Sequence, residues 1–269
     1  MKQKTQKFGG AMFTPVLLFA FAGIMVGLAT TCMNPQIMGD LANPESIWYK
    51  FWAMISAGAN TVFNQLPVLF AVSLPIALAK KQNARACMET FVIYITFNYF
   101  VSEFLNQFGS SLGFDFAAEV GGTSGLAMIA GIKTLDTGMI GAILIAGIAI
   151  YLHNKFYDKE LPDYLGVFKG SAFVVMIGFF VMIPVAILIA LVWPHVQSAL
   201  LGLQGFFKAS GAAGLFTYNL LQKLLLPFGV HHFIYAPVLF DNVIVDGGTI
   251  SYWAQHLPDF VNSSKPLIE

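Results

Sequence analysis

Three ionisable side chains interrupt the apolar segment QKLLLPFGVHHFIY: Lys223, His231 and His232. If this segment lies in a membrane, such groups are costly and usually face a polar cavity or a partner. Pro227 and Gly229 come just before the two histidines and predict a break in the helix. A broken helix exposes backbone amides and carbonyls, which favours a polar ligand site at mid-membrane depth.

The histidines suggest two kinds of chemistry and one plain alternative. Imidazole exchanges a proton near neutral pH, so it could hydrogen-bond a hydroxylated ligand or act as a base on a hydroxyl. The alternative is an interfacial histidine pair at a helix end, and the residues alone leave both readings open. Adjacent histidines point in different directions on a helix, and no HExxH pattern or third ligand is nearby. We therefore expect no metal and no cofactor.

The remaining histidines suggest less. His153 is followed by Asn154 and Lys155, so we expect it to be solvated at a span end. His195 follows Trp193 and Pro194, and Trp193 is typical of the aromatic belt at a membrane surface.

The composition predicts a membrane protein. Of 269 residues, 57% are hydrophobic and 10% are charged, and the mean hydropathy is +0.71. A soluble domain has about 25% charged residues. The net charge of zero gives no reason to expect a nucleic-acid partner. Cys32 and Cys87 lie in unrelated apolar contexts, so we expect free thiols.

Five stretches approach the roughly 20 apolar residues that a transmembrane helix needs. They are Met12–Thr31, Gly58–Ala79, Ala86–Phe104, Thr137–Leu152 and Gly170–Trp193. A sixth zone, Ala212–Phe240, is interrupted by prolines, glycine and the histidines. Lipid leaves no partner for free backbone groups, so we expect helices. The predicted fold is an all-α polytopic membrane protein with about five spans plus a broken helical segment.

Basic residues predict the orientation. With the N-terminus in the cytoplasm, nine basic residues lie inside: Lys2, Lys4, Lys7, Lys80, Lys81, Arg85, Lys155, Lys159 and Lys169. Three lie outside, namely Lys50, Lys133 and Lys208. This bias follows the positive-inside rule and predicts a cytoplasmic N-terminus. Among acids, only Glu89 lies within a span, so an ion pathway is not favoured.

Small residues and prolines mark packing and bends. Gly23 and Gly27 form a GxxxG pair, and Gly138, Ala142 and Ala146 form a second small face. Close helix packing and the general abundance of glycine in membrane helices explain these faces equally well.

Three prolines, at positions 67, 75 and 184, lie inside predicted spans and are expected to kink them. The glycine-rich stretch Ser102–Asp136 is predicted to be an outside loop with a flexible turn at GGTSG.

Several motifs in order resemble one family. LLLPFGVHHFIYAPVLF is similar to the L-x-P-x-G-L-H-H motif of the membrane IIC component of the bacterial sugar phosphotransferase system, glucose superfamily. FGGAMFTPVLLFAFAGI, NQLPVLFAVSLPIALAK, AGIKTLDTGMIGAIL and HNKFYDKELPDYLGVFKG also resemble it, over residues 8 to about 260. YWAQHL and TLDTG point to the α-glucoside or maltose branch.

The resemblance implies a sugar permease of the bacterial cell membrane. Such a protein binds a sugar from outside and presents it inside, where a phosphocysteine on a IIB domain phosphorylates it. The IIB domain receives its phosphate through IIA and the general phosphocarrier proteins. The family histidine near the accepting hydroxyl maps onto His231, with His232 beside it and Gly229 in the same motif. Lys223 stands where the family usually has arginine. Lysine keeps the positive charge but cannot form the bidentate hydrogen bonds of a guanidinium group. The expected partners are a sugar, a IIB domain, the lipid bilayer and a second copy.

The resemblance also implies a division of the chain. Residues 1–10 would be a basic cytoplasmic segment, 11–200 a transmembrane interface half that forms the homodimer, and 201–269 the start of the sugar-transport half. The family's later T-E-P loop and the IIB cysteine motif do not occur in these residues, so an N-terminal fragment is expected. A non-transporting remnant or a membrane scaffold is the alternative function.

Overall fold

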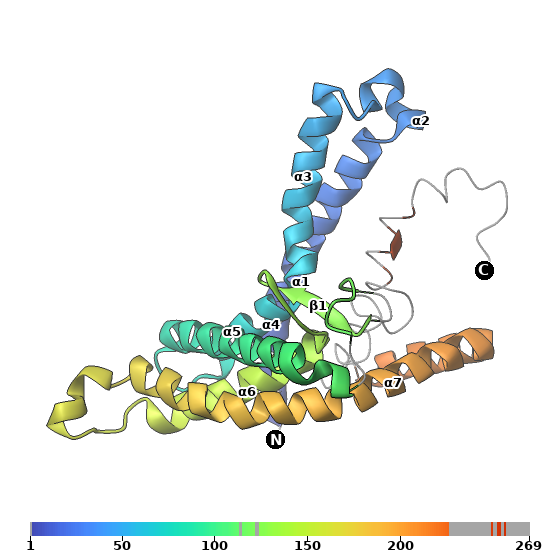
Figure 1. Cartoon of the computed structure of the whole chain (residues 1–269). Helices are drawn as coiled ribbons and strands as arrows, with labels where there is room; N and C mark the ends of the chain where they lie inside the picture. The colour runs from blue at the N-terminus through green and yellow to red at the C-terminus, as the bar shows by residue number, and fades with distance from the viewer. Residues whose placement is uncertain are drawn as a thin grey trace.

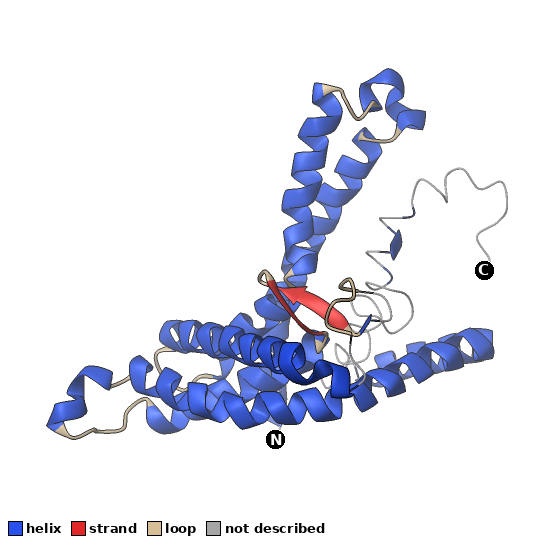
Figure 2. Ribbon diagram, in the orientation of Figure 1, coloured by secondary structure: helices blue, strands red, loops and turns tan. Residues whose placement is uncertain are grey.

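The computed structural model describes residues 2–112, 115–121 and 124–225, together with residues 249, 252, 253 and 256. In this part of the chain helices dominate, with one small hairpin among them (Figure 2). Helices cover all five predicted spans. The all-α class of the fold is therefore confirmed.

Four helices form a bundle that carries most of the core. They are α4 (Leu66–Leu78), α5 (Asn83–Phe108), α6 (Gly138–Phe156) and α7 (Ser171–Leu225). In Figure 1, α5, α6 and α7 run side by side, and α4 packs against α5 and α6. Large side chains such as Phe70, Tyr94 and Phe97 are fully buried between them.

Small residues let α6 approach its neighbours. Ala142, Ala146 and Ala149 are all at most 1% exposed and belong to the hydrophobic core. They recur at the spacing that places residues on one helix face. Ala142 and Ala146 belong to the predicted small face, so close packing there is confirmed.

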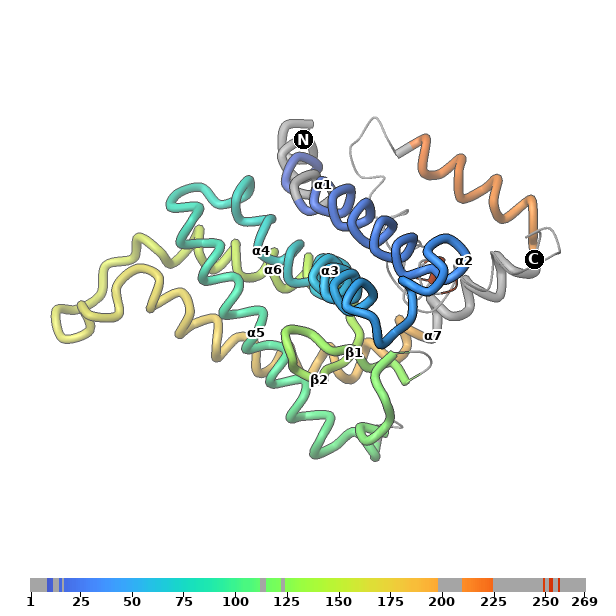
Figure 3. Tube along the Cα trace, turned by 90° about the horizontal axis from the view of Figure 1, so that it is seen from above, coloured from blue at the N-terminus to red at the C-terminus, as the bar shows by residue number. Residues whose placement is uncertain are grey.

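A second, smaller unit rises from the bundle. Helix α1 (Lys2–Cys32) packs against α3 (Ile47–Asn64), and the two stand together in Figures 1 and 3. The short helices α2 (Pro35–Met38) and η1 (Gly39–Ala42) join them at the far end. Many large apolar side chains of α1 are exposed, among them Leu17, Phe21, Ile24 and Leu28.

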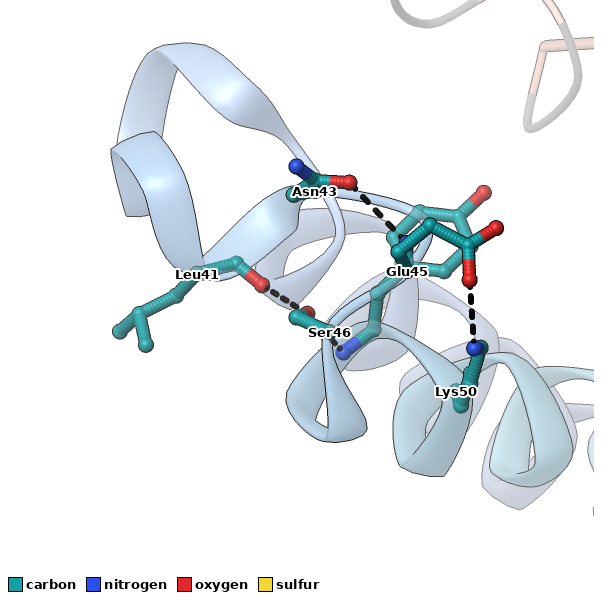
Figure 4. A network of polar contacts seen from close by, with 6 residues as sticks. Leu41, Asn43, Glu45, Ser46 and Lys50 are labelled. Carbon is teal, nitrogen blue, oxygen red and sulfur yellow. Dashed lines mark hydrogen bonds and ion pairs between the residues drawn. The ribbon is translucent and has the colours of Figure 1, made fainter.

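The start of α3 is fixed by side-chain caps, drawn in Figure 4. Ser46 Oγ accepts a hydrogen bond from the Tyr49 amide at 3.0 Å and donates to the Leu41 carbonyl at 2.6 Å. Lys50 forms an exposed ion pair with Glu45 at 2.8 Å. An N-cap serine satisfies an amide that the helix itself leaves unbonded, which is why the helix begins here.

The second predicted span, Gly58–Ala79, is not one straight helix. Helix α3 ends at Asn64 and α4 begins at Leu66, with a bend of 57° between them. Gln65 has non-helical backbone angles, and Pro67 lies in the first turn of α4. Proline has no amide hydrogen and suits a first turn, so it starts a new helix here instead of kinking one.

The loop that was predicted to lie outside contains an ordered hairpin, which was not predicted from the sequence. Strands β1 (Leu126–Ile129) and β2 (Ile132–Leu135) pair antiparallel, with Ile129 opposite Ile132. The two residues between them, Ala130 and Gly131, both have positive φ, which suits a tight two-residue turn. The Ala130 amide donates to Gln65 Oε1 at 2.8 Å, so the turn is tied to the α3–α4 bend.

The helices differ in how clearly they could cross a membrane. Two described helical segments, Gly138–Phe156 and Ser171–Gln197, are long and apolar enough, and two bent pairs bring the number to four. One pair is α3 with α4, and the other is Leu17–Cys32 with Pro35–Ala42, bent by 56°. Helix α5 is not among them because Glu89, Asn98 and other polar residues interrupt it. The structure thus supports a polytopic membrane protein.

Helix α7 extends far beyond its predicted span. Pro184 and Pro194 lie inside it, and non-helical backbone angles occur at Gly211, where two helices meet. Gly211 has φ 48°, a conformation that favours glycine. The sixth apolar zone therefore begins in a helix, and its later part lies outside the described residues.

Candidate functional site

The predicted ligand residues are only partly described. Lys223 is exposed in the last turn of α7, where a positive charge suits the negative end of the helix dipole. Gly229, His231 and His232 lie outside the described residues. Their role in sugar binding stays a prediction. Within the described part of the chain, no three His, Cys, Asp or Glu side chains come close enough to hold a metal ion.

The described bundle holds a different ionisable site. Glu89 of α5 and His153 of α6 are each 1% exposed, and Glu89 Oε2 lies 2.6 Å from His153 Nδ1. His153 was expected to be solvated, and that expectation is wrong. Asn154 and Lys155, which follow it in sequence, are less buried, whereas His153 continues the buried face of Ala142, Ala146 and Ala149.

The second ring nitrogen of His153 fixes the tautomer. Nε2 lies 2.8 Å from the backbone carbonyl oxygen of Lys81, which can only accept a hydrogen bond. Nε2 therefore carries a hydrogen. The contact joins α6 to the turn of residues 79–82, which links α4 to α5.

Three further bonds join this turn and the start of α5 to the end of α6. The Lys80 amide donates to Asn154 Oδ1 at 2.8 Å, and Lys81 Nζ pairs with Asp158 at 2.8 Å. Arg85 Nη1 donates to the Tyr157 hydroxyl, also at 2.8 Å. We call the four links, including His153 to Lys81, the basic clasp. It places two of the predicted cytoplasmic loops at the same end of the bundle, as the charge pattern requires.

Asp136 organises the opposite end of the bundle. Its backbone carbonyl accepts hydrogen bonds from Trp193 Nε1 at 2.6 Å and Gln197 Nε2 at 3.0 Å. Its side chain accepts from the Gly138 amide at the start of α6. Trp193 is 6% exposed, so the expectation that it faces the membrane surface is wrong. Its indole N–H finds a carbonyl inside the protein, as a buried tryptophan usually does.

Burial raises the pKa of the Asp136 carboxyl, which lies just before the α6 span, because the charged form loses water. A raised folded-state pKa means that stability is highest below the unfolded pKa and falls as pH rises through the folded pKa. We expect Asp136→Asn, which keeps the oxygen facing Gly138, to stabilise the protein at neutral pH and to change little near pH 4. Unfolding midpoints in detergent across this pH range check the result. A greater gain at acidic pH would contradict it.

Comparison with known proteins decides the family. Residues 9–265 match the family model described as "Phosphotransferase system, EIIC". The chain belongs to this family. An EIIC chain is a membrane permease component, in agreement with the apolar helices described above.

Several curated relatives are similar to this EIIC chain along its whole length. The "PTS system maltose-specific EIICB component" of Bacillus subtilis (strain 168) is 55% identical over 100% of the chain, which covers 51% of that relative. The "PTS system alpha-glucoside-specific EIICB component" of Leptotrichia buccalis is 52% identical over 99% of the chain and 50% of the relative. The "Phosphotransferase IIC component GlvC" of Escherichia coli (strain K12) is 49% identical, with 73% of its length covered. The chain thus spans about half the length of the EIICB relatives.

The Glu89–His153 pair was not predicted, although the sequence contains a signal for it. Both are ionisable groups inside otherwise apolar helices, and both lie near the basic end of their predicted spans. Groups of opposite sign at the same depth of a membrane commonly pair. Treating the two residues together would have indicated the contact.

Proposed function

We propose that the chain is the sugar-translocating IIC part of a phosphoenolpyruvate-dependent phosphotransferase system that takes an α-glucoside such as maltose. The observation that carries the proposal is the identity of 48–55% with maltose- and alpha-glucoside-specific EIICB components along the chain. At this identity the fold and the order of the motifs are shared. The substrate comes from the relatives' names, so it is a proposal for this chain.

The partners follow from the same relatives. Their names join a IIC part to a IIB part, so we propose that a IIB domain phosphorylates the bound sugar from the cytoplasmic side. His231 would hydrogen-bond the sugar and help to orient or deprotonate the accepting hydroxyl, with His232 and Gly229 in the same motif. Lys223 would supply a nearby positive charge. IIA and the general phosphocarrier proteins would act through IIB.

We further propose the division into an interface half, residues 11–200, and the start of a transport half, residues 201–269. Among the residues whose burial is described, Trp193 is the last member of the buried core, and the break at Gly211 follows it, which supports a boundary in this region. A Cβ added at Gly23 or Gly27 would meet nothing within 4 Å. This open small-residue face on α1, beside exposed apolar side chains, supports packing against a second copy.

The test is phosphoenolpyruvate-dependent uptake of labelled maltose by cells that express this protein together with a IIB domain. We expect uptake in the parent, and a fall of about 100-fold or more in His231→Ala if the histidine acts as an acid–base group. The control is Lys50→Ala. Lys50 lies near the start of α3, away from the bundle, and forms an exposed ion pair with Glu45, so this variant should keep full uptake.

Uptake that survives in His231→Ala would refute the role of the histidine. A parent that forms dimers in the membrane but takes up no α-glucoside would favour the scaffold function instead. Maltose, other α-glucosides and glucose are compared in the same cells to identify the sugar.

A further inference from the structure

The buried pair of Glu89 and His153 must hold a proton between its facing atoms. Since Nε2 already donates its hydrogen to Lys81, the remaining contact is Nδ1 against a carboxyl oxygen at 2.6 Å. Without a proton, two lone pairs would face each other at that distance and repel. One proton therefore lies there, either on the imidazole or on the carboxyl. Both arrangements have the same number of protons and no net charge.

We propose that this shared proton makes the basic clasp a pH-sensitive latch on the turn of residues 79–82. Removing the proton leaves a buried negative charge and two opposed acceptors. Adding a second one leaves a buried imidazolium beside a neutral carboxyl. Both changes put net charge into a site that water does not reach, and charge without a partner is costly there.

The surroundings offer little to compensate such a charge. Glu89 Oε1 has no hydrogen-bond partner among the described residues. Helix α4 and residues 171–193 of α7 contain no titratable side chain. The nearby charged or titratable groups are Lys80, Lys81, Arg85, Cys87, Tyr157 and Asp158. The Lys81 and Arg85 side chains are already engaged with Asp158 and Tyr157 at the exposed surface.

The proton is coupled to the turn through short contacts. His153 holds the Lys81 carbonyl directly, and the next residue, Asn154, holds the Lys80 amide. Gln82, which ends the turn, has φ 47°, a conformation that a residue with a side chain rarely adopts. Such a conformation persists only where its surroundings impose it. When a net charge disrupts the pair, His153 no longer holds the Lys81 carbonyl in place, and the turn is held less firmly against α6.

The experiment measures the mobility of this turn against pH. A spin label is attached at Ala84→Cys, an exposed position beside the turn, in the full chain with Cys32→Ser and Cys87→Ser. Electron paramagnetic resonance spectra are recorded from about pH 3.5 to about pH 10, a range that includes the ordinary pKa values of Glu and His and stays below that of Lys. We expect the immobile component of the spectrum to be lost at the alkaline end. A label at Ser110→Cys, beyond the far end of α5, is the control.

Glu89→Gln separates a shared proton from mere packing. The glutamine amide can donate its own hydrogen to Nδ1, so the clasp stays closed without a titratable proton. We expect the alkaline loss of the immobile component to disappear in this variant, and acid loosening to begin at a higher pH. A parent with no alkaline loosening, or a variant with the same alkaline loosening as the parent, would overturn the proposal.

A second measurement does not depend on the variant. In the parent labelled with ¹⁵N-histidine, the Nδ1 resonance of His153 should change at the same pH as the spin label, while Nε2 stays bonded to hydrogen. An Nδ1 resonance that titrates at a different pH from the loosening would also overturn the latch.

Discussion

His153→Ala is expected to lower the free energy of unfolding by about 3–5 kcal/mol, the usual cost of removing one partner of a buried ion pair. The Glu89 carboxyl, 1% exposed in the parent, would lose the imidazole that contacts Oε2, and its other oxygen has no hydrogen-bond partner among the described residues. The Lys81 carbonyl would lose its donor as well. Denaturant titration in detergent, followed by the fluorescence of the four tryptophans, measures the loss.

The chain provides a matched control for this effect. Lys81 and Asp158 form an ion pair at 2.8 Å in the same clasp, but their side chains are 70% and 63% exposed. Exposed pairs contribute about 0–1 kcal/mol, so Asp158→Ala should cost far less than His153→Ala. Equal losses in the two variants would contradict the importance of burial. The double variant Glu89→Leu with His153→Leu should lose less free energy of unfolding than the sum of the losses in the two single variants. In the double variant neither ionisable group is left buried without its partner.

The helices could be predicted because hydropathy is a property of each stretch of sequence by itself. Apolar runs of about 20 residues predicted five spans, and helices cover all of them, although α5 is not apolar enough to count as a candidate span by length and composition alone. The exact ends were harder to predict. The bend at Gln65 is tied by a hydrogen bond to Ala130, which is 65 residues away in sequence.

The hairpin shows a second limit. Its strands have four residues each, too few for an alternating pattern to stand out from the apolar background. Its turn uses Ala130, which is not a residue that typically marks positive φ. A short strand pair in a membrane protein is therefore specified mostly by its tertiary contacts, here with α5 and with Gln65.

The two candidate sites also differ in whether local sequence reveals them. The motif around His231 could be recognised from local sequence, because its proline, glycine and histidines are neighbours in the chain. Glu89 and His153 are 64 residues apart, and only the packing of α5 against α6 brings them together. His153 was judged by the residues that follow it. Its helix neighbours Ala149 and Ala146, both buried, were the better guide to its surroundings.

Gly178→Leu is expected to destabilise the protein by about 3 kcal/mol through overpacking between α5 and α7. A Cβ at Gly178 would lie 2.6 Å from the Cδ1 and Cγ1 atoms of Ile93, closer than side chains can approach. Ile93 is 1% exposed and cannot turn away into solvent. The neighbouring rings of Phe100 and Phe179 pack edge to face at 5.0 Å, so the two helices are also held together there.

Two comparisons isolate the cause of that loss. Gly147 of α6 is an exposed helical glycine with nothing within 4 Å of a built Cβ, so Gly147→Leu should not destabilise the protein and should gain up to about 1 kcal/mol from the higher helix propensity of leucine. In an Ile93→Ala background, Gly178→Leu fills the space that the isoleucine leaves, and its cost should fall well below that in the parent. Residues in contact show such coupling, whereas independent sites add. Equal costs of Gly178→Leu in the two backgrounds would mean that Ile93 does not set the distance between α5 and α7.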